Sequence, residues 1–338
     1  MKYSSRFFLY APLGLFLAIA IGVAIHWWLA VAALSARLQA MNGREIVPGV
    51  TMRFASRSIT GFPFSLDTVF RGFALRIDTP HGATEWRPEE FAMHALTYGR
   101  DETIFEAAGK QELRWTKDDG TARDLIFAVG SLHASAIRDL DALDRFDLDI
   151  VGFGSKSLTA QRLQFHLRRT RRFSTFDIFV MVNDMRFPAA DSPDLGGHIT
   201  DGRLVGTVTP DWGYERLWTG DQSWFKAADN WRREHGELYV NELSLTWNEL
   251  KLERIGARVL RLDEAHRPQG SLGLEITGMQ RFRQRAVTEH LSHGANMGLV
   301  GALLDHAGAG DRTTIDFDFG NGLVMVGGER ADTVTPLY

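Results

Sequence analysis

The stretch Arg162–Asn183, "RLQFHLRRTRRFSTFDIFVMVN", decides the fold because apolar and polar side chains alternate along it twice. Leu163, Phe165 and Leu167 share one side of an extended chain, and the polar residues between them share the other. A second alternating set follows a polar turn around Thr170: Phe176, Ile178, Val180 and Val182. We therefore predict a long antiparallel hairpin with one apolar face and one wet face.

The same alternation recurs along most of the chain and predicts further strands between Gly, Asp and Asn punctuation. The clearest examples are "FSLDTVFRGFALRID" (64–78), "RFDLDIVGFG" (145–154), "GELYVNELSLTWN" (236–248) and "TTIDFDFGNGLVMVGG" (313–328). Two segments show helical spacing instead: 211–236, which contains Trp224, Ala228 and Trp231, and 281–310, with a break near Gly294.

The N-terminal stretch Phe7–Ala36 contains no Asp, Glu, Lys or Arg, and it exceeds the about 20 apolar residues of helix that cross a bilayer core. Lys2 and Arg6 precede it, so the positive-inside tendency places the N-terminus in the cytoplasm and the body outside. Trp27 and Trp28 fit the far membrane interface. A cleaved signal peptide is the alternative, because small residues lie near the end of the stretch, but its apolar region is typically only about 7–15 residues long.

These signals predict a mainly β fold of the α+β class: a transmembrane helix, then long, strongly twisted antiparallel sheet, packed with one or two helical segments. Residues 1–6 form the cytoplasmic N-terminus, 7–36 the transmembrane helix and its extension, 37–49 a linker, 50–209 a first β-rich half, and 210–338 a helix plus a second β-rich half with a C-terminal helical segment. A Leu-Arg pair follows Gly109 and Gly256 at the same offset, which leaves two similar halves and chance similarity as alternatives.

The bulk composition excludes several classes of protein. A net charge of -4 with 44% hydrophobic residues describes a globular body without the basic surface that a nucleic-acid partner requires. The absence of cysteine removes disulfide scaffolds, thiolate zinc sites and cysteine nucleophiles. The sequence also lacks a Gly-x-Ser-x-Gly elbow and a His-Glu-x-x-His helix, so we do not expect an enzyme, and an uncharacterised hydrolase is the remaining catalytic alternative.

Three sequence patterns resemble ligand-binding sites but have simpler structural interpretations. The "GFGSKS" stretch at 152–157 lacks phosphate-loop spacing and is typical of a turn. A metal ion could be bound by His290 and His293, with Glu289 or His306 as a third ligand. The sequence shows no complete ligand set, so we interpret these residues as part of a solvated helix face. An acidic run could hold calcium but lacks the glycine and the terminal glutamate of an EF-hand, so turn and wet-face residues are preferred. Its members are Asp139, Asp141, Asp144, Asp147 and Asp149.

The stretch Ile59–Asp67, "ITGFPFSLD", interrupts the strand pattern with Gly61, Phe62, Pro63 and Phe64. Proline has no N–H and fits a sheet only at an edge, a strand start or a bulge. We therefore predict a structural turn that ends one strand and begins the next. Phe62 and Phe64 are expected to plug opposite faces of its entry rather than to contact a ligand.

This turn also carries a resemblance. An N-terminal membrane helix, the Gly-Phe-Pro-Phe turn with Leu66-Asp67 after it, the "LTW" strand at Leu245 and "LRLDEAHRPQGSLGLEITG" (260–278) together resemble the bacterial family called domain of unknown function 2125. The turn after a membrane anchor is also similar to the start of repeats in AsmA-like envelope proteins, which are β-rich, periplasmic and linked to outer-membrane lipid traffic. The resemblance implies an alphaproteobacterial host and a periplasmic body, and the family label itself implies no activity.

Two features are candidate contacts for a lipid or a protein partner. The first is a basic cluster at the predicted hairpin tip: Arg168, Arg169, Arg171 and Arg172. Guanidinium groups there could pair with lipid phosphates, or they could simply keep a turn soluble. The second is the aromatic stripe with Trp224 and Trp231, which is either core or one wall of a groove for an acyl chain.

We therefore expect a single-pass inner-membrane protein, anchored through residues 7–36, with a periplasmic body. The body is expected to act as a non-catalytic envelope factor that holds phospholipid or lipopolysaccharide in an apolar sheet groove. The alternative is a scaffold module whose sheet edge or helices bind another envelope protein. Neither hypothesis requires a cofactor or a metal.

Overall fold

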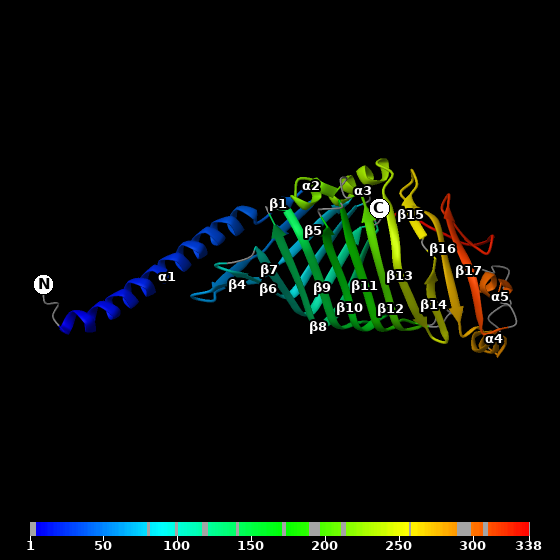
Figure 1. Ribbon diagram of the computed structural model, residues 1–338, viewed down its shortest axis with the longest axis horizontal. Coiled ribbons are helices and arrows are strands. Elements are labelled where there is room, and N and C mark those ends of the chain that lie inside the picture. The colour runs from blue at the N-terminus through cyan, green and yellow to red at the C-terminus, as the bar shows by residue number, and fades with distance from the viewer. Residues whose placement is uncertain are drawn as a thin grey trace.

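The computed structural model describes residues 5–79, 82–98, 101–116, 121–139, 142–170, 174–188, 197–210, 214–256, 258–288, 299–306 and 310–337. A long helix, α1 (Ser5–Met41), leads into one antiparallel sheet, in which the described residues form 19 strands. Helix and sheet lie end to end, so the molecule is elongated and α1 leaves the sheet at one end (Figure 1). The predicted fold class is confirmed.

The strands differ in length along the sheet. The first are β1 (Arg44–Val47), β2 (Val50–Arg53), β3 (Ser56–Thr60), β4 (Ser65–Arg71), β5 (Ala74–Thr79) and β6 (Gly82–Leu96). The central strands are β7 (Glu102–Thr116), β8 (Ala122–Asp139), β9 (Ala142–Ser155), β10 (Thr159–Thr170), β11 (Thr175–Arg186) and β12 (His198–Thr209). The last are β13 (Glu237–Trp247), β14 (Leu250–Ile255), β15 (Arg258–Leu262), β16 (Pro268–Thr277), β17 (Arg312–Gly320), β18 (Leu323–Val326) and β19 (Glu329–Thr333).

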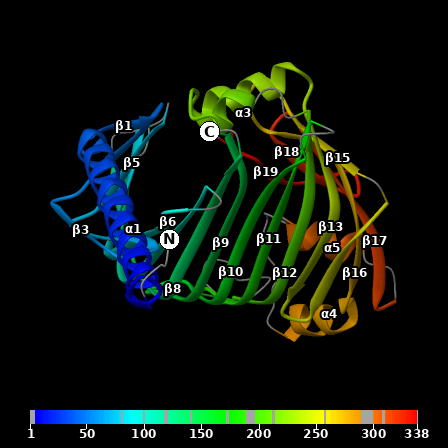
Figure 2. The ribbon, with the colours of Figure 1, turned by 60° about the vertical axis from the view of Figure 1, so that its left-hand side comes forward.

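The middle of the sheet is a meander, because each strand from β6 to β13 pairs with the one before it. Near both ends a strand is broken into two shorter ones. β5 and β4 pair with the first and last parts of β6, and β15 and β14 pair in the same way with the first and last parts of β13. All described strands thus belong to one sheet, whose curled shape is seen in Figure 2.

The two predicted halves, 50–209 and 210–338, lie in one sheet. Strands β12 and β13 pair across the boundary at 209 and 210, with Val208 opposite Leu238, so the two predicted halves share one uninterrupted sheet. The predicted linker, 37–49, contains the last turn of α1 and strand β1. Gly109 lies within β7 and Gly256 lies between β14 and β15, so the two predicted repeat positions fall in differently built strands.

The hairpin predicted from the opening stretch is confirmed, with β10 and β11 antiparallel from Arg162 opposite Asn183 to Thr170 opposite Thr175. Residues directly opposite in such a pair project from the same face. Leu163 lies opposite Val182 on β11 and opposite Ile150 on β9, so the apolar side of the hairpin continues onto the next strand. The remaining registers extend this apolar face across the sheet.

Helices cover parts of the apolar face in three places. The last turns of α1 pack over the first strands through Leu38. Helices α2 (Glu215–Trp218) and α3 (Trp224–Arg233) pack over the ends of β10 to β12 through Trp218 and Trp231. Helices α4 (Met279–Thr288) and α5 (Leu299–His306) pack over β16 and β17 through Phe282 and Leu303. Both predicted helical segments therefore contain helices.

Gly278 connects β16 to α4 and offers a test of this packing. A Cβ atom there would lie 1.9 Å from the Glu249 carbonyl oxygen, and the residue has a φ of +90°. Gly256→Ala is the matched control, because Gly256 has a φ of +68° but nothing within 4 Å of the added Cβ. We expect Gly256→Ala to lower the free energy of unfolding by about 1–2 kcal/mol and Gly278→Ala by about 2–5 kcal/mol, measured by urea unfolding of the detergent-solubilised chain. Equal losses would show that the close approach is relieved without cost.

Candidate functional site

The middle of the apolar face is the candidate site, because the helices leave it uncovered. Five side chains form what we call the central apolar strip: Leu148, Ile150, Leu163, Val180 and Val182. All five are half-buried and lie outside the three buried clusters of the described chain. Together they present a continuous hydrocarbon surface on β9, β10 and β11.

The three helix-covered clusters border this strip. Leu132 on β8, which lies opposite Ile150 on β9, belongs to the cluster under α1. Phe165, two residues beyond Leu163, belongs to the cluster under α2 and α3. Leu204, opposite Val180, belongs to the cluster under α4 and α5. The strip therefore lies between α1, which leaves one end of the sheet, and α4 and α5 at the other end (Figure 1).

The opposite face of the same strands is polar and is joined by ion pairs. His166 Nδ1 lies 2.5 Å from Asp147 Oδ1, and Arg145 pairs with the same carboxylate at 2.6 Å. Arg162 donates two hydrogen bonds of 2.8 Å to Asp149. These contacts tie β9 to β10 and leave the two carboxylates engaged with cations of the protein.

These contacts bear on the predicted ligand patterns. Asp147 and Asp149 belong to the acidic run, and the structure places them on the polar face as wet-face residues. Asp141 lies outside the described residues, as do Glu289, His290 and His293, and no side chain is described for His306. Within the described ranges, no group of three or more His, Asp or Glu side chains is arranged to hold a metal ion.

The two described arginines of the predicted basic cluster lie on opposite faces of β10. Arg168 is exposed on the polar side of β10, whereas Arg169 is half-buried on the apolar side. The guanidinium of Arg169 lies 5.5 Å from the ring centroid of Trp218 and donates a long hydrogen bond of 3.5 Å to the Leu143 carbonyl. Arg169 thus packs against α2, and Arg171 and Arg172 lie outside the described residues.

The two tryptophans of the predicted aromatic stripe have different environments. Trp231 is only 6% exposed and packs in the cluster under α2 and α3, whereas Trp224 is 49% exposed and touches Tyr214 at the edge of this cluster. Tyr214 and Trp218 are buried in the same cluster and were not singled out from the sequence. Their spacing to Trp231 does not follow one helix, because a turn separates α2 from α3.

The Gly61–Phe64 turn connects β3 to β4, as predicted, and the Gly61 carbonyl accepts hydrogen bonds from the amides of Phe64 and Ser65. The expectation that Phe62 and Phe64 plug the sheet is wrong, because these side chains are 58% and 57% exposed. The turn instead contacts α1. The indole of Trp27 donates a 2.9 Å hydrogen bond to the Ser65 carbonyl, and its ring meets Phe62 edge-on at 5.5 Å.

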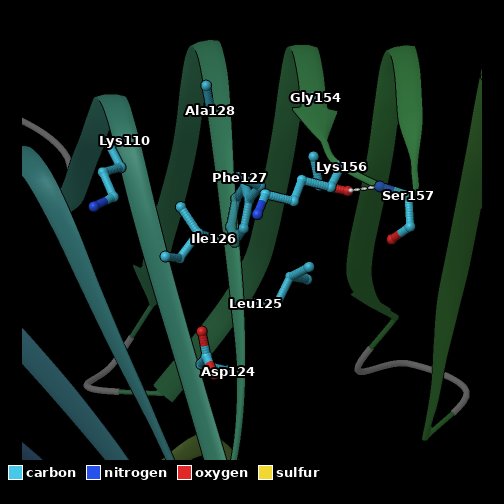
Figure 3. A pocket seen from close by; sticks show the side chains of 10 residues that line it. Lys110, Asp124, Leu125, Ile126, Phe127, Ala128, Gly154, Lys156 and Ser157 are labelled. Carbon is cyan, nitrogen blue, oxygen red and sulfur yellow. Dashed lines mark hydrogen bonds between the residues drawn. The ribbon is translucent and has the colours of Figure 1, made fainter.

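A surface hollow of about 650 Å³ opens beside β7, β8 and the β9–β10 turn (Figure 3). Of the stretch 152–157, which was predicted to be a turn, the first four residues form the end of β9, and only Lys156 and Ser157 lie in the turn to β10. The Ser155 hydroxyl accepts the Ser157 and Leu158 amides at 3.3 and 2.9 Å, so it is used in closing the turn. The hollow combines Lys110 and Lys156 with Asp124 and apolar side chains, and none of the predicted contact residues that the structure describes lines it.

The fold and the site define the class of protein: a single antiparallel sheet with one apolar face, carried on an N-terminal helix long and apolar enough to cross a membrane. A helix of this kind is compatible with single-pass anchoring and also passes for a signal sequence. The chain belongs to the bacterial family described as "Uncharacterized protein conserved in bacteria (DUF2125)", which matches residues 27–330. Comparison with curated proteins and with solved structures gives no match. The family prediction is confirmed, and the similarity to AsmA-like proteins stays a prediction.

The ion pairs of the polar face predict acid sensitivity. Burial alone would raise the pKa of Asp147, but hydrogen bonds with His166 and Arg145 outweigh burial and lower this pKa; a hydrogen bond with Arg162 likewise lowers the pKa of Asp149. A carboxyl group with a lower pKa in the folded chain binds fewer protons there than in the unfolded chain, so its stabilising effect is lost as the pH falls. The loss should begin around the ordinary value of 3.8 and continue below it.

Asp147→Asn tests this interpretation. We expect the variant to be less stable than the parent chain at pH 6, and the difference to shrink as the pH falls below 3.8, in urea titrations followed by circular dichroism. Asp124→Asn, which changes an exposed carboxylate, is the control and should follow the parent chain at each pH. A pH-independent difference for Asp147→Asn would contradict the assignment.

Proposed function

We propose that this protein is a non-catalytic envelope factor, anchored in the bacterial inner membrane, whose periplasmic sheet holds the acyl chains of a phospholipid or lipopolysaccharide. The observation that carries the proposal is the central apolar strip, where five neighbouring aliphatic side chains are only half-buried. An acyl chain that covered them would remove apolar surface from water, at about 25 cal/mol per Å².

The packing of α1 supports an anchor that stays attached. Leu38 is 5% exposed within the first buried cluster, and Arg57 donates hydrogen bonds of 2.7 and 2.8 Å to the carbonyl and hydroxyl oxygens of Ser35. Cleavage after the small residues near Ala36 would remove Ser35 and Trp27, which both contact the body. Lys2 and Arg6 support an N-terminus in the cytoplasm.

The position of the strip supports a lipid as its occupant. The sheet extends away from α1 (Figure 1), so its apolar face begins beside the helix that would lie in the bilayer. The strip itself is aliphatic, whereas the polar groups of β9 and β10 point to the other face. A surface of this kind offers an acyl chain apolar contact and few hydrogen-bonding partners.

Photocrosslinking tests the proposal directly. Benzoylphenylalanine in place of Leu163 or Val180 lies in the strip, and in place of Gln164 or Met181 it lies on the polar face of the same strands. We expect irradiation in native envelope membranes to give lipid adducts several-fold more often at 163 and 180 than at 164 and 181, measured by mass spectrometry of the full chain.

The outcomes separate the two functional hypotheses. Peptide adducts confined to 163 and 180 would favour a scaffold module that binds another envelope protein. The same low lipid yield at all four positions would overturn lipid binding by the strip, while leaving the membrane anchor intact.

A further inference from the structure

Two turns meet at the end of the sheet from which α1 leaves. One is the Gly61–Phe64 turn, and the other begins where β6 ends, at Leu96. The Thr97 amide donates a 3.1 Å hydrogen bond to the Phe64 carbonyl, and the rings of Phe64 and Tyr98 lie edge-on with centroids 6.0 Å apart. The two turns are therefore one unit.

This unit exposes four large apolar side chains, which we call the aromatic tip: Phe62, Phe64, Leu96 and Tyr98. Their exposed fractions are 58%, 57%, 53% and 61%. Single exposed apolar residues are ordinary, but a contiguous group indicates an interaction surface. The nearest carboxylate on β4, Asp67, is engaged by Ser65 and His94 at 2.8 Å each, so its charge is partnered within the sheet.

The aromatic tip lies at a defined level of α1. His26 Nε2 is 3.3 Å from the Thr97 carbonyl oxygen, and Trp27 contacts both Ser65 and Phe62. The apolar stretch begins at Phe7, so the about 20 residues that cross a bilayer core end near His26. Trp28, which is 68% exposed, then lies at the level of the lipid headgroups, where indole side chains are enriched.

We propose that the aromatic tip inserts into the interfacial region of the same membrane leaflet at which α1 emerges, as a second membrane contact. This inference rests on α1 as a retained anchor and is independent of lipid binding by the central apolar strip. The occupant is a lipid surface because the tip continues the level of Trp27 and Trp28, and because the tip combines wholly apolar side chains with the amphipathic ring of Tyr98, which suits a boundary that is apolar on one side and wet on the other. Two points of attachment would fix how the sheet is oriented on the membrane.

The chain contains no cysteine, so one introduced cysteine carries one fluorophore. Phe62→Cys and Tyr98→Cys place the label in the tip. Val287→Cys places it on α4 at the other end of the sheet, where the native side chain is 73% exposed (Figure 1). Leu17→Cys places it within the apolar part of α1. Each full-length variant is reconstituted in vesicles of phosphatidylethanolamine and phosphatidylglycerol.

Labels at 62 and 98 are expected to be quenched by bromine on the upper acyl chain and to be several-fold less accessible to iodide than the label at 287. Iodide quenching at 62 and 98 equal to that at 287, with the label at 17 still quenched by brominated lipid, would overturn the tip contact but not the anchor. Loss of lipid quenching at 17 would instead show that α1 is not inserted, and the inference would fail with the anchor.

A second variant tests whether the label itself, rather than the native side chains, causes the membrane contact. Phe62→Ser combined with Phe64→Ser removes two of the four side chains but keeps the backbone hydrogen bond between the turns. We expect iodide access to a label at 98 to rise several-fold in this background, with the circular dichroism spectrum unchanged. No change in access, in a folded chain, would also overturn the proposal.

Discussion

Every other part of the molecule depends on how the apolar face of the sheet is covered. Antiparallel pairing places Leu163 beside Ile150 and Val182, so the face is continuous, and water contact with it is unfavourable. The chain covers this face with the end of α1, with α2 and α3, and with α4 and α5. The polar face needs no cover, because ion pairs such as Arg162 with Asp149 occupy it. The uncovered middle is therefore the place where we propose that this fold holds an acyl chain.

The sequence was sufficient for features that depend on local periodicity. Alternation in Arg162–Asn183 predicted the β10–β11 hairpin, and the uncharged stretch Phe7–Ala36 predicted α1. Features that depend on distant partners were missed. Phe62 lies against Trp27 of α1 rather than in the sheet, and Arg169 packs against Trp218 of α2. No spacing within either segment contains this information, since each contact joins parts of the chain far apart in sequence.

The first helix has two roles in one element. Its apolar N-terminal part has the length to cross a bilayer, while Ser35 and Leu38 hold the first strands through hydrogen bonding and burial. The long helix has no break between these parts. A rigid connection of this kind transmits the orientation of the helix directly to the sheet, unlike a flexible linker, which would let the body rotate freely.

The meander also sets how far the protein extends from α1. From β6 to β13 each strand pairs with its predecessor, so this part of the sheet grows sideways by about 4.8 Å for every full strand added. Inserting or deleting a whole hairpin would change this reach by about 10 Å without rethreading any other strand, because both edges of the gap would still face complementary neighbours. Distance from α1 is thus encoded as a number of strands, which is a property that relatives of different length could vary in simple steps.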